Sequence, residues 1–98
     1  SENMIVPEPL SFEWDKGNSD KNRISHGISN EQAEEPFFDD KKKIAKDVFH
    51  SKKEKRYILL GKTKNNILLY IAWTIRNKKI RIISARRMNK KEVPLYEK

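Results

Sequence analysis

Arginine side chains are the groups in this sequence best suited to chemistry on a phosphate. Arg86 and Arg87 follow an apolar segment directly, and Arg56 opens another apolar segment two residues after Glu54. The rigid guanidinium can hold a phosphate through two hydrogen bonds. The competing interpretations are a solvated surface charge for one of Arg86 and Arg87, and an ion pair between Arg56 and Glu54. Adjacent residues of a strand point to opposite faces, so only one of Arg86 and Arg87 can easily join a given site.

Two histidines could move protons, and they stand far apart in the chain. His26 precedes Gly27 at the expected C-terminus of a helix, where a positive charge is favoured, which suits a general acid or a phosphate contact. A helix-capping imidazole is the alternative. His50 beside Ser51 could suggest a nucleophilic pair, but adjacent side chains of an extended chain point apart, so we expect a surface loop there. Neither histidine has metal-ligand spacing, and the sequence predicts no metal site and no cofactor.

The charge of the chain restricts its partners. The 98 residues contain 22 Lys and Arg against 14 Asp and Glu, a formal net charge of +8. This charge fits a polyphosphate or an acidic protein as partner. Cysteine is absent, which excludes disulfides, thiolate metal sites and a cysteine nucleophile. No apolar segment is long enough to span a bilayer and no signal peptide is recognisable, so we expect a soluble, cytoplasmic protein without a membrane partner.

The chain is short enough for a single domain, which we place at residues 10–98 after a tail of residues 1–9 that holds two prolines. Two polar segments predict helices, over residues 16–25 with Asp15 as N-cap and from Ser29 through Glu35. Gly27 is expected to close the first helix, and a glutamine three residues after Ser29 completes a capping box for the second.

Five segments have the composition of β-strands: Leu10–Trp14, Ile44–His50, Arg56–Leu60, Ile67–Thr74 and Lys79–Ala85. Asn-rich turns between the last three predict tight hairpins and an antiparallel meander. Residues 67–73 are almost continuously apolar, which predicts a central strand covered on both faces. Phe37 and Phe38 are expected to dock the helices onto the sheet, and a short helix from Asn89 to Lys98, with Pro94 inside it, closes an α+β domain.

Four aromatic residues are candidates for stacking on unpaired bases: Trp14, Tyr57, Tyr70 and Trp73. Tyr70 and Trp73 lie in the most apolar strand, so we expect them in the core.

Residues spread along nearly the whole chain share their order and spacing with one known family. They are Phe12-Glu13-Trp14-Asp15, Asn22, His26-Gly27-Ile28-Ser29, Glu31, Ala33, Phe37, Asp39, His50-Ser51, Glu54, Arg56, Gly61, Thr74, Arg76, Arg81-Ile82-Ile83-Ser84-Ala85-Arg86-Arg87, Glu92 and Tyr96. In these residues the chain resembles the BrnT toxins. Asn18 and Ser25 depart from the pattern, because the family usually has lysine there.

The resemblance implies a RelE-like fold, with a small antiparallel meander, two N-terminal helices on one face and a short C-terminal helix. It also implies a toxin of a type II toxin–antitoxin pair that inhibits growth by cutting RNA. The implied partner is a BrnA-like antitoxin, which alone contacts operator DNA and forms a heterotetramer with the toxin.

Cutting RNA without a metal requires a base for the 2′-hydroxyl, cations for the phosphate and an acid for the leaving 5′-oxygen. The catalytic candidates are Arg56, Arg86, Arg87 and His26. The candidates for RNA binding are Arg76, Arg81, Lys62 and Tyr96. The alternatives are a non-catalytic basic nucleic-acid-binding module, or a mainly structural protein whose basic face binds an acidic antitoxin.

Overall fold

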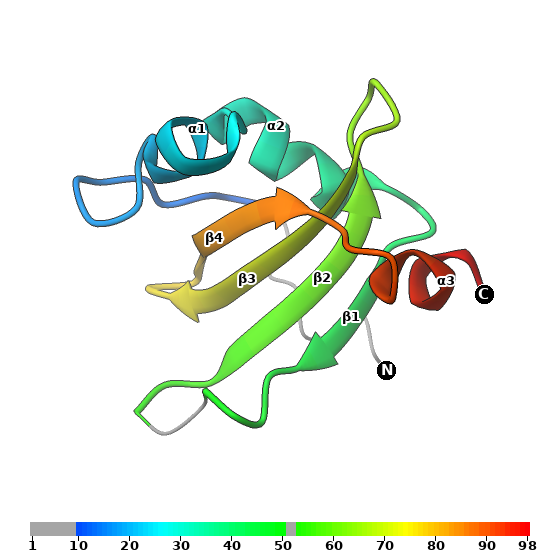
Figure 1. Ribbon diagram of the computed structural model, residues 1–98. Helices are drawn as coiled ribbons and strands as arrows, with labels where there is room; N and C mark the ends of the chain where they lie inside the picture. The colour runs from blue at the N-terminus through cyan, green and yellow to red at the C-terminus, as the bar shows by residue number, and fades with distance from the viewer. Residues whose placement is uncertain (1–9, 51–52) are drawn as a thin grey trace.

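The computed structural model describes residues 10–50 and 53–98 and forms one sheet with helices around it (Figure 1). The predicted tail of residues 1–9 lies outside the described residues. The elements are α1 (Lys21–His26), α2 (Asn30–Glu34), the 3-10 helix η2 (Glu35–Phe38), β1 (Lys43–Lys46), β2 (Arg56–Lys62), β3 (Leu68–Arg76), β4 (Lys79–Arg87) and α3 (Glu92–Glu97).

The four strands lie in chain order, and every neighbouring pair is antiparallel, which confirms the predicted meander. Asn77 and Lys78 form the two-residue turn between β3 and β4. Their φ values are 55° and 63°, and a type I′ hairpin turn requires a positive φ at both central residues. The turn between β2 and β3 is wider than predicted. There the Thr63 amide donates to the Ile67 carbonyl over 2.9 Å, and the Thr63 hydroxyl accepts from the Ile67 amide.

The core lies between the sheet and the segment from α1 to η2. Leu59, Ile71 and Ala85 stand opposite one another on three strands and are fully buried. The Phe37 ring packs edge-on against Trp73, with centroids 5.3 Å apart. Gly61 has no room for a side chain, because a Cβ atom there would lie 2.9 Å from the Cβ of Pro36 in η2.

The opposite side of the sheet, which we call the open face, carries Arg56, Ile58, Leu60, Tyr70, Ala72 and Arg86. All of these side chains except Leu60 are half-exposed. On this side of the sheet, α3 lies against β2 only near the end of the strand that holds Leu60 (Figure 1). β3 therefore alternates between buried and half-exposed residues, and the prediction of a strand covered on both faces is wrong. Tyr70 belongs to the open face and not to the core.

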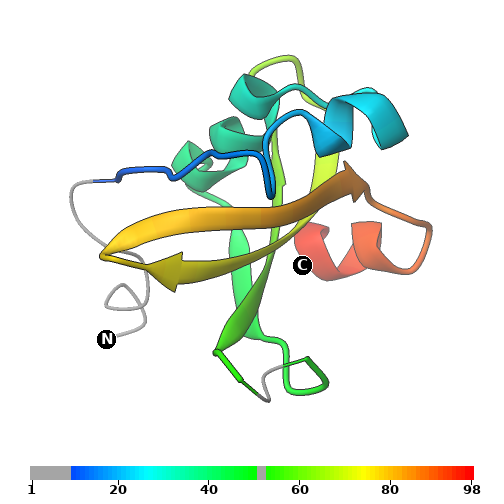
Figure 2. The ribbon, with the colours of Figure 1, turned by 90° about the vertical axis from the view of Figure 1, so that its left-hand side faces the viewer.

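The N-terminal part differs most from expectation. The predicted strand Leu10–Trp14 pairs only at Phe12, which forms a parallel bridge with Ile80 beside β4 (Figure 2). Residues 16–20 form turns, so the first helix begins at Lys21 and Asp15 does not cap it. Asn18 is buried in these turns and donates to the carbonyls of Glu13 and Ile82, so this departure from the family pattern has a structural role.

The predicted ends of the helices are correct in two places. Gly27 closes α1 with a φ of 70°, and Ser29 and Gln32 form the expected capping box of α2. The last helix starts later than predicted, because α3 begins at Glu92 with Lys91 as its N-cap; Asn89 precedes it and exchanges two hydrogen bonds with Glu92. Pro94 lies in the first turn of α3, where a missing amide hydrogen costs no helical bond.

Two aromatic and strand predictions need correction. Phe37 is buried as expected, but Phe38 is 65% exposed, because the 3-10 turn directs adjacent side chains to different sides. The strand predicted over 44–50 is β1, Lys43–Lys46, and a turn begins after it.

Candidate active site

Of the three arginines predicted to be catalytic, the register of the sheet places Arg56 and Arg86 on the open face, well apart. Arg56 pairs with Thr74, and Arg86 pairs with Tyr70, four residues further back along β3. At a rise of about 3.3 Å per residue these two positions are separated by about 13 Å along the strands. Arg87 pairs with Leu69 and points to the helix side, as expected for the neighbour of Arg86.

Arg86 is held firmly in place. Its two terminal nitrogens donate to the two carboxylate oxygens of Glu92 over 2.9 and 2.8 Å, and its guanidinium lies 4.0 Å from the centre of the Tyr70 ring. The hydrogen bond from Arg86 holds the pKa of Glu92 below its usual range. Both groups therefore stay charged, and the Arg86 cation is fixed at one end of the open face.

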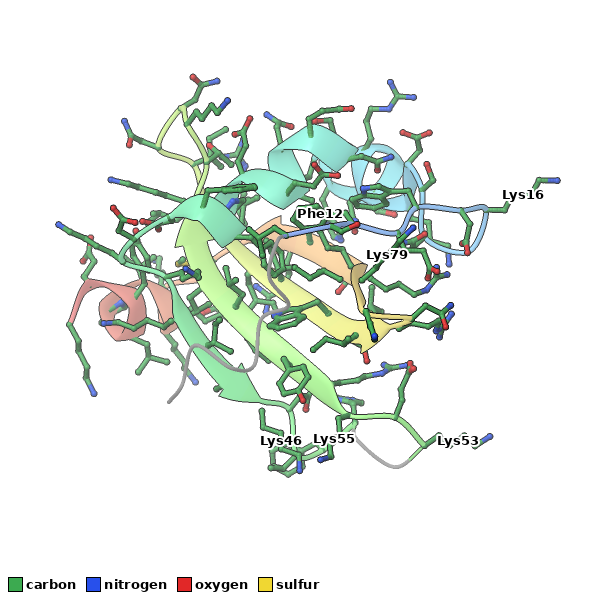
Figure 3. The ribbon with its side chains drawn as sticks, turned by 180° about the vertical axis from the view of Figure 1, so that it is seen from behind. Phe12, Lys16, Lys46, Lys53, Lys55 and Lys79 are labelled. Carbon is green, nitrogen blue, oxygen red and sulfur yellow. The ribbon has the colours of Figure 1, made fainter. Side chains whose placement is uncertain are left out.

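The other end of the open face holds a pocket with several kinds of ionisable side chain, which we call the His50 pocket. Its lining residues are Phe49, His50, Lys53, Glu54, Arg56 and Arg76. Lys53 lies with Lys46 and Lys55 at the same end of the molecule, around the loop after β1 (Figure 3). The pocket combines an imidazole, an ammonium and two guanidinium groups.

His50 is oriented by a carboxylate. Its Nδ1 lies 2.9 Å from Oδ2 of Asp47, whose side chain is only 13% exposed while that of His50 is 67% exposed. The carboxylate can only accept, so the pairing assigns the hydrogen to Nδ1 and leaves Nε2 able to take a proton. The Asp47 amide donates to the Arg56 carbonyl over 2.8 Å, which ties the histidine loop to the start of β2.

Glu54 links the two arginines of the pocket. Its carboxylate oxygens lie 3.9 Å from Nε of Arg56 and 3.4 Å from Nη2 of Arg76. The predicted ion pair of Arg56 with Glu54 is therefore present, and Arg76 joins it. All three side chains are at least one-third exposed, and exposed pairs of this kind are weak enough for a phosphate to compete with.

Two other predicted site residues, Arg81 and Tyr96, make contacts that hold the fold. The Arg81 side chain is 11% exposed and donates to both Glu13 and Asp15. Hydrogen bonds from Arg81 and from a backbone amide hold the pKa of Asp15 at about 2. Tyr96 is buried and donates to Asp39 over 2.5 Å, and burial together with this carboxylate raises the pKa of Tyr96 to about 12.

Lys62 and His26 lie away from the His50 pocket. Lys62 lines a different hollow together with Glu31, Glu34 and Glu35. His26 ends α1 on the helix side of the sheet, and its side chain makes no hydrogen bond or ion pair with a described residue. Of the predicted site residues, the structure thus brings Arg56 and Arg76 together and leaves Arg86 apart on the same face.

Sequence reasoning missed the residues that give the pocket its chemistry. His50 had been expected in a plain surface loop, and Asp47 had not been singled out. A signal was present, because an aspartate three residues before a histidine can accept from the backbone of a tight turn and reach the ring at the same time. The stacking candidates are engaged elsewhere: Trp73 is fully buried against Tyr57, and Trp14 donates to Glu34 over 2.6 Å.

No group of three or more His, Asp or Glu side chains in residues 10–50 and 53–98 is arranged to hold a metal ion. Among these same residues, no helix has the length and apolar character required to cross a membrane.

Comparison with known proteins identifies one family. The family model described as the ribonuclease toxin BrnT of type II toxin–antitoxin systems matches residues 14–92. No curated protein matches the sequence. The matched range covers the whole His50 pocket and both ends of the open face.

Proposed function

The chain belongs to the BrnT family of ribonuclease toxins of type II toxin–antitoxin systems, and we propose that it cleaves RNA in the His50 pocket. One observation carries this assignment: the imidazole oriented by Asp47 lines the same pocket as Arg56 and Arg76. The imidazole can serve as the base for the 2′-hydroxyl, and the two guanidinium groups can serve as the cations for the phosphate, which are two of the three groups that metal-free RNA cleavage requires.

The proposed step is an attack of the ribose 2′-oxygen on the adjacent phosphorus. Nε2 of His50 takes the proton of the 2′-hydroxyl as the new oxygen–phosphorus bond forms. Arg56 and Arg76 leave Glu54 and stabilise the charge on the non-bridging oxygens. The bond to the 5′-oxygen then breaks, and that oxygen receives a proton from Lys53 or from water. The products are a 2′,3′-cyclic phosphate on one fragment and a 5′-hydroxyl on the other.

The rest of the substrate is proposed to cross the open face toward Arg86. The positions of Arg56 and Arg86 are separated by about 13 Å along the strands, so the two arginines would contact different phosphates of the RNA. Arg86 would then bind a phosphate distant from the cleaved one. We also propose a RelE-like fold for this chain. The antiparallel meander of four strands, with short helices before it and one after it, supports this proposal.

Side chains of the protein can supply both the base and the charge stabilisation for this step, and we therefore propose that cleavage needs no metal ion. Histidine supplies the proton transfer, and guanidinium groups supply the charge stabilisation that a metal provides in other nucleases. Cleavage would take place in the cytoplasm, where the RNA lies.

Family membership implies a protein antitoxin, which we propose to be BrnA-like and to cover the open face in a heterotetramer. A groove on this face is lined by apolar residues, among them Ile58 and Leu60, and by Lys43. An acidic segment with apolar residues fits such a groove and blocks the path of the RNA. Operator DNA would be bound through the antitoxin.

The test compares the two histidines of the chain in purified protein. His50→Gln should reduce the rate of RNA cleavage by about 10²- to 10⁴-fold, the usual contribution of a general base. His26→Gln is the matched control and should cleave like the wild type. Equal rates for wild type and His50→Gln would remove His50 from the mechanism.

The alternative function is nucleic-acid binding without catalysis. The net charge of +8 and the lysines around the His50 pocket favour it, since both attract nucleic acid without requiring catalysis. This alternative predicts RNA binding by the wild type with no appearance of cyclic-phosphate ends.

A further inference from the structure

Phe49 is an exposed aromatic side chain that the proposed cleavage step does not use. It is 84% exposed, and its ring contacts no other aromatic ring in the described part of the chain. Its backbone is nevertheless fixed, because its amide donates to Oδ1 of Asp47 over 3.2 Å. The same carboxylate therefore orients the His50 imidazole and the Phe49 backbone.

The surroundings of Phe49 indicate what its ring could contact. It lines the His50 pocket with Arg56 and Arg76, and the nearby lysines Lys46, Lys53 and Lys55 gather at this end of the molecule (Figure 3). Lysine is among the residues that are depleted in protein–protein interfaces. An aromatic ring among cations is instead the pattern of a site for unpaired nucleic acid, in which bases stack while the backbone is neutralised.

We infer that Phe49 is a stacking site for the unpaired base next to the phosphate held by Arg56 and Arg76. The inference rests on the proposed function in one respect, since that function places the cleaved phosphate in the His50 pocket. It names the substrate class: single-stranded RNA, or a loop whose bases are splayed out. The bases of a duplex are already stacked on their neighbours and cannot reach the ring.

Binding is the direct test, and it can be made without cleavage. The probe is a fluorescein-labelled single strand of 2′-O-methyl nucleotides, which lacks the nucleophilic 2′-hydroxyl. Three versions are compared by fluorescence anisotropy: the full strand, an abasic strand of the same length, and the strand annealed to its complement. The wild type should bind the full strand more tightly than the other two.

Phe49→Ala should weaken binding of the full strand about tenfold, the typical loss for one stacked base. It should leave binding of the abasic strand unchanged, and it should not alter the dependence of affinity on salt, because no phosphate contact is removed. Phe49→Trp should retain full affinity. Phe38→Ala is the matched control: Phe38 is also exposed but lies beside glutamates, so no change is expected.

Two results would overturn the inference: equal affinity of wild type and Phe49→Ala for the full strand, or an equal loss for the full and abasic strands. A Phe49→Ala variant that binds RNA normally but loses an antitoxin contact would assign the ring to a protein partner instead. Failure of the proposed function would be seen in a different assay: His50→Gln would cleave unmodified RNA at the same rate as the wild type. An unchanged melting temperature of Phe49→Ala confirms that the fold is retained.

Discussion

The ion pair between Arg86 and Glu92 offers the sharpest prediction about the open face. Arg86 stands on β4 and Glu92 begins α3, so the pair ties the last helix to the sheet. Arg86→Ala removes the two hydrogen bonds to Glu92, the bond from Nη1 to the Arg87 carbonyl, and the contact with the Tyr70 ring. It also leaves the carboxylate of Glu92, which is only 14% exposed, without its cation.

The expected cost follows from this geometry. Hydrogen bonds to a charged group contribute about 1.5–3 kcal/mol, and an exposed cation–π contact adds about 0.5–1 kcal/mol. Arg86 is about one-third exposed, so solvent screening reduces these figures. We expect the free energy of unfolding to fall by about 1–2 kcal/mol. For a domain of this size that lowers the melting temperature by about 5–15 °C.

Thermal unfolding of matched variants measures this cost. Arg87→Ala is the control, because Arg87 points to the other face and is exposed; its melting temperature should change by no more than about 3 °C. Glu92→Gln removes the charge but keeps an oxygen for the Asn89 amide, so a cycle of single and double variants isolates the ion pair. A change below about 2 °C for Arg86→Ala would refute the reasoning.

The same variants decide whether Arg86 also binds RNA. Glu92→Gln releases the guanidinium and should tighten binding of a non-cleavable single strand, whereas Arg86→Ala should weaken it. If Arg87→Ala weakens binding more than Arg86→Ala, the RNA follows the helix side and not the open face.

The remaining predictions concern metals, pH and the antitoxin. Cleavage should persist in excess EDTA; activity that disappears with the chelator and returns with magnesium would contradict the proposed mechanism. Tyr96→Phe should make stability less dependent on pH. Folded Tyr96 keeps its proton up to about pH 12, so the wild type loses its advantage over the variant as the pH rises from 10 toward 12 in urea titrations. Burial alone would raise the pKa of Asp39, but the hydrogen bonds from Tyr96 and from backbone amides lower it below its usual value. The stability advantage of the wild type over Tyr96→Phe should therefore also shrink in acid, as Asp39 takes up a proton. Association with the antitoxin, followed by stopped flow, should slow as salt is added, and an unchanged rate would exclude electrostatic steering.

The elements that sequence predicted correctly are those determined by local rules. The capping box at Ser29 depends on a hydroxyl and a glutamine three residues apart, and the end of α1 depends on the left-handed conformation of Gly27. The order of the strands followed from short turns, since tight connections force neighbours to be antiparallel. Each of these features is settled within a few residues of chain.

The failures arise where distant residues decide the structure. Asp15 had every local property of a helix N-cap, yet Arg81, far along the chain, forms two hydrogen bonds with it and starts the helix later. Phe38 had the composition of a core residue, but the space on the sheet is filled by Phe37, which meets Trp73. The spacing of residues in the sequence does not show which of two neighbouring side chains will occupy a given place on the sheet or pair with a distant residue.

The site shows the same division, and a single irregularity in β4 explains much of it. Strict alternation along β4 would put Arg81 on the side of Ala85 and Arg87. The register shifts between Ala72 and Trp73, where Ser84 and Ile82 are the successive partners and Ile83 is the extra residue. Arg81 therefore changes sides, to the face that carries Arg86, where Glu13 and Asp15 hold it. A bulge of this kind leaves no mark in an apolar run, so the sequence could nominate the arginines but could not say which of them share a face.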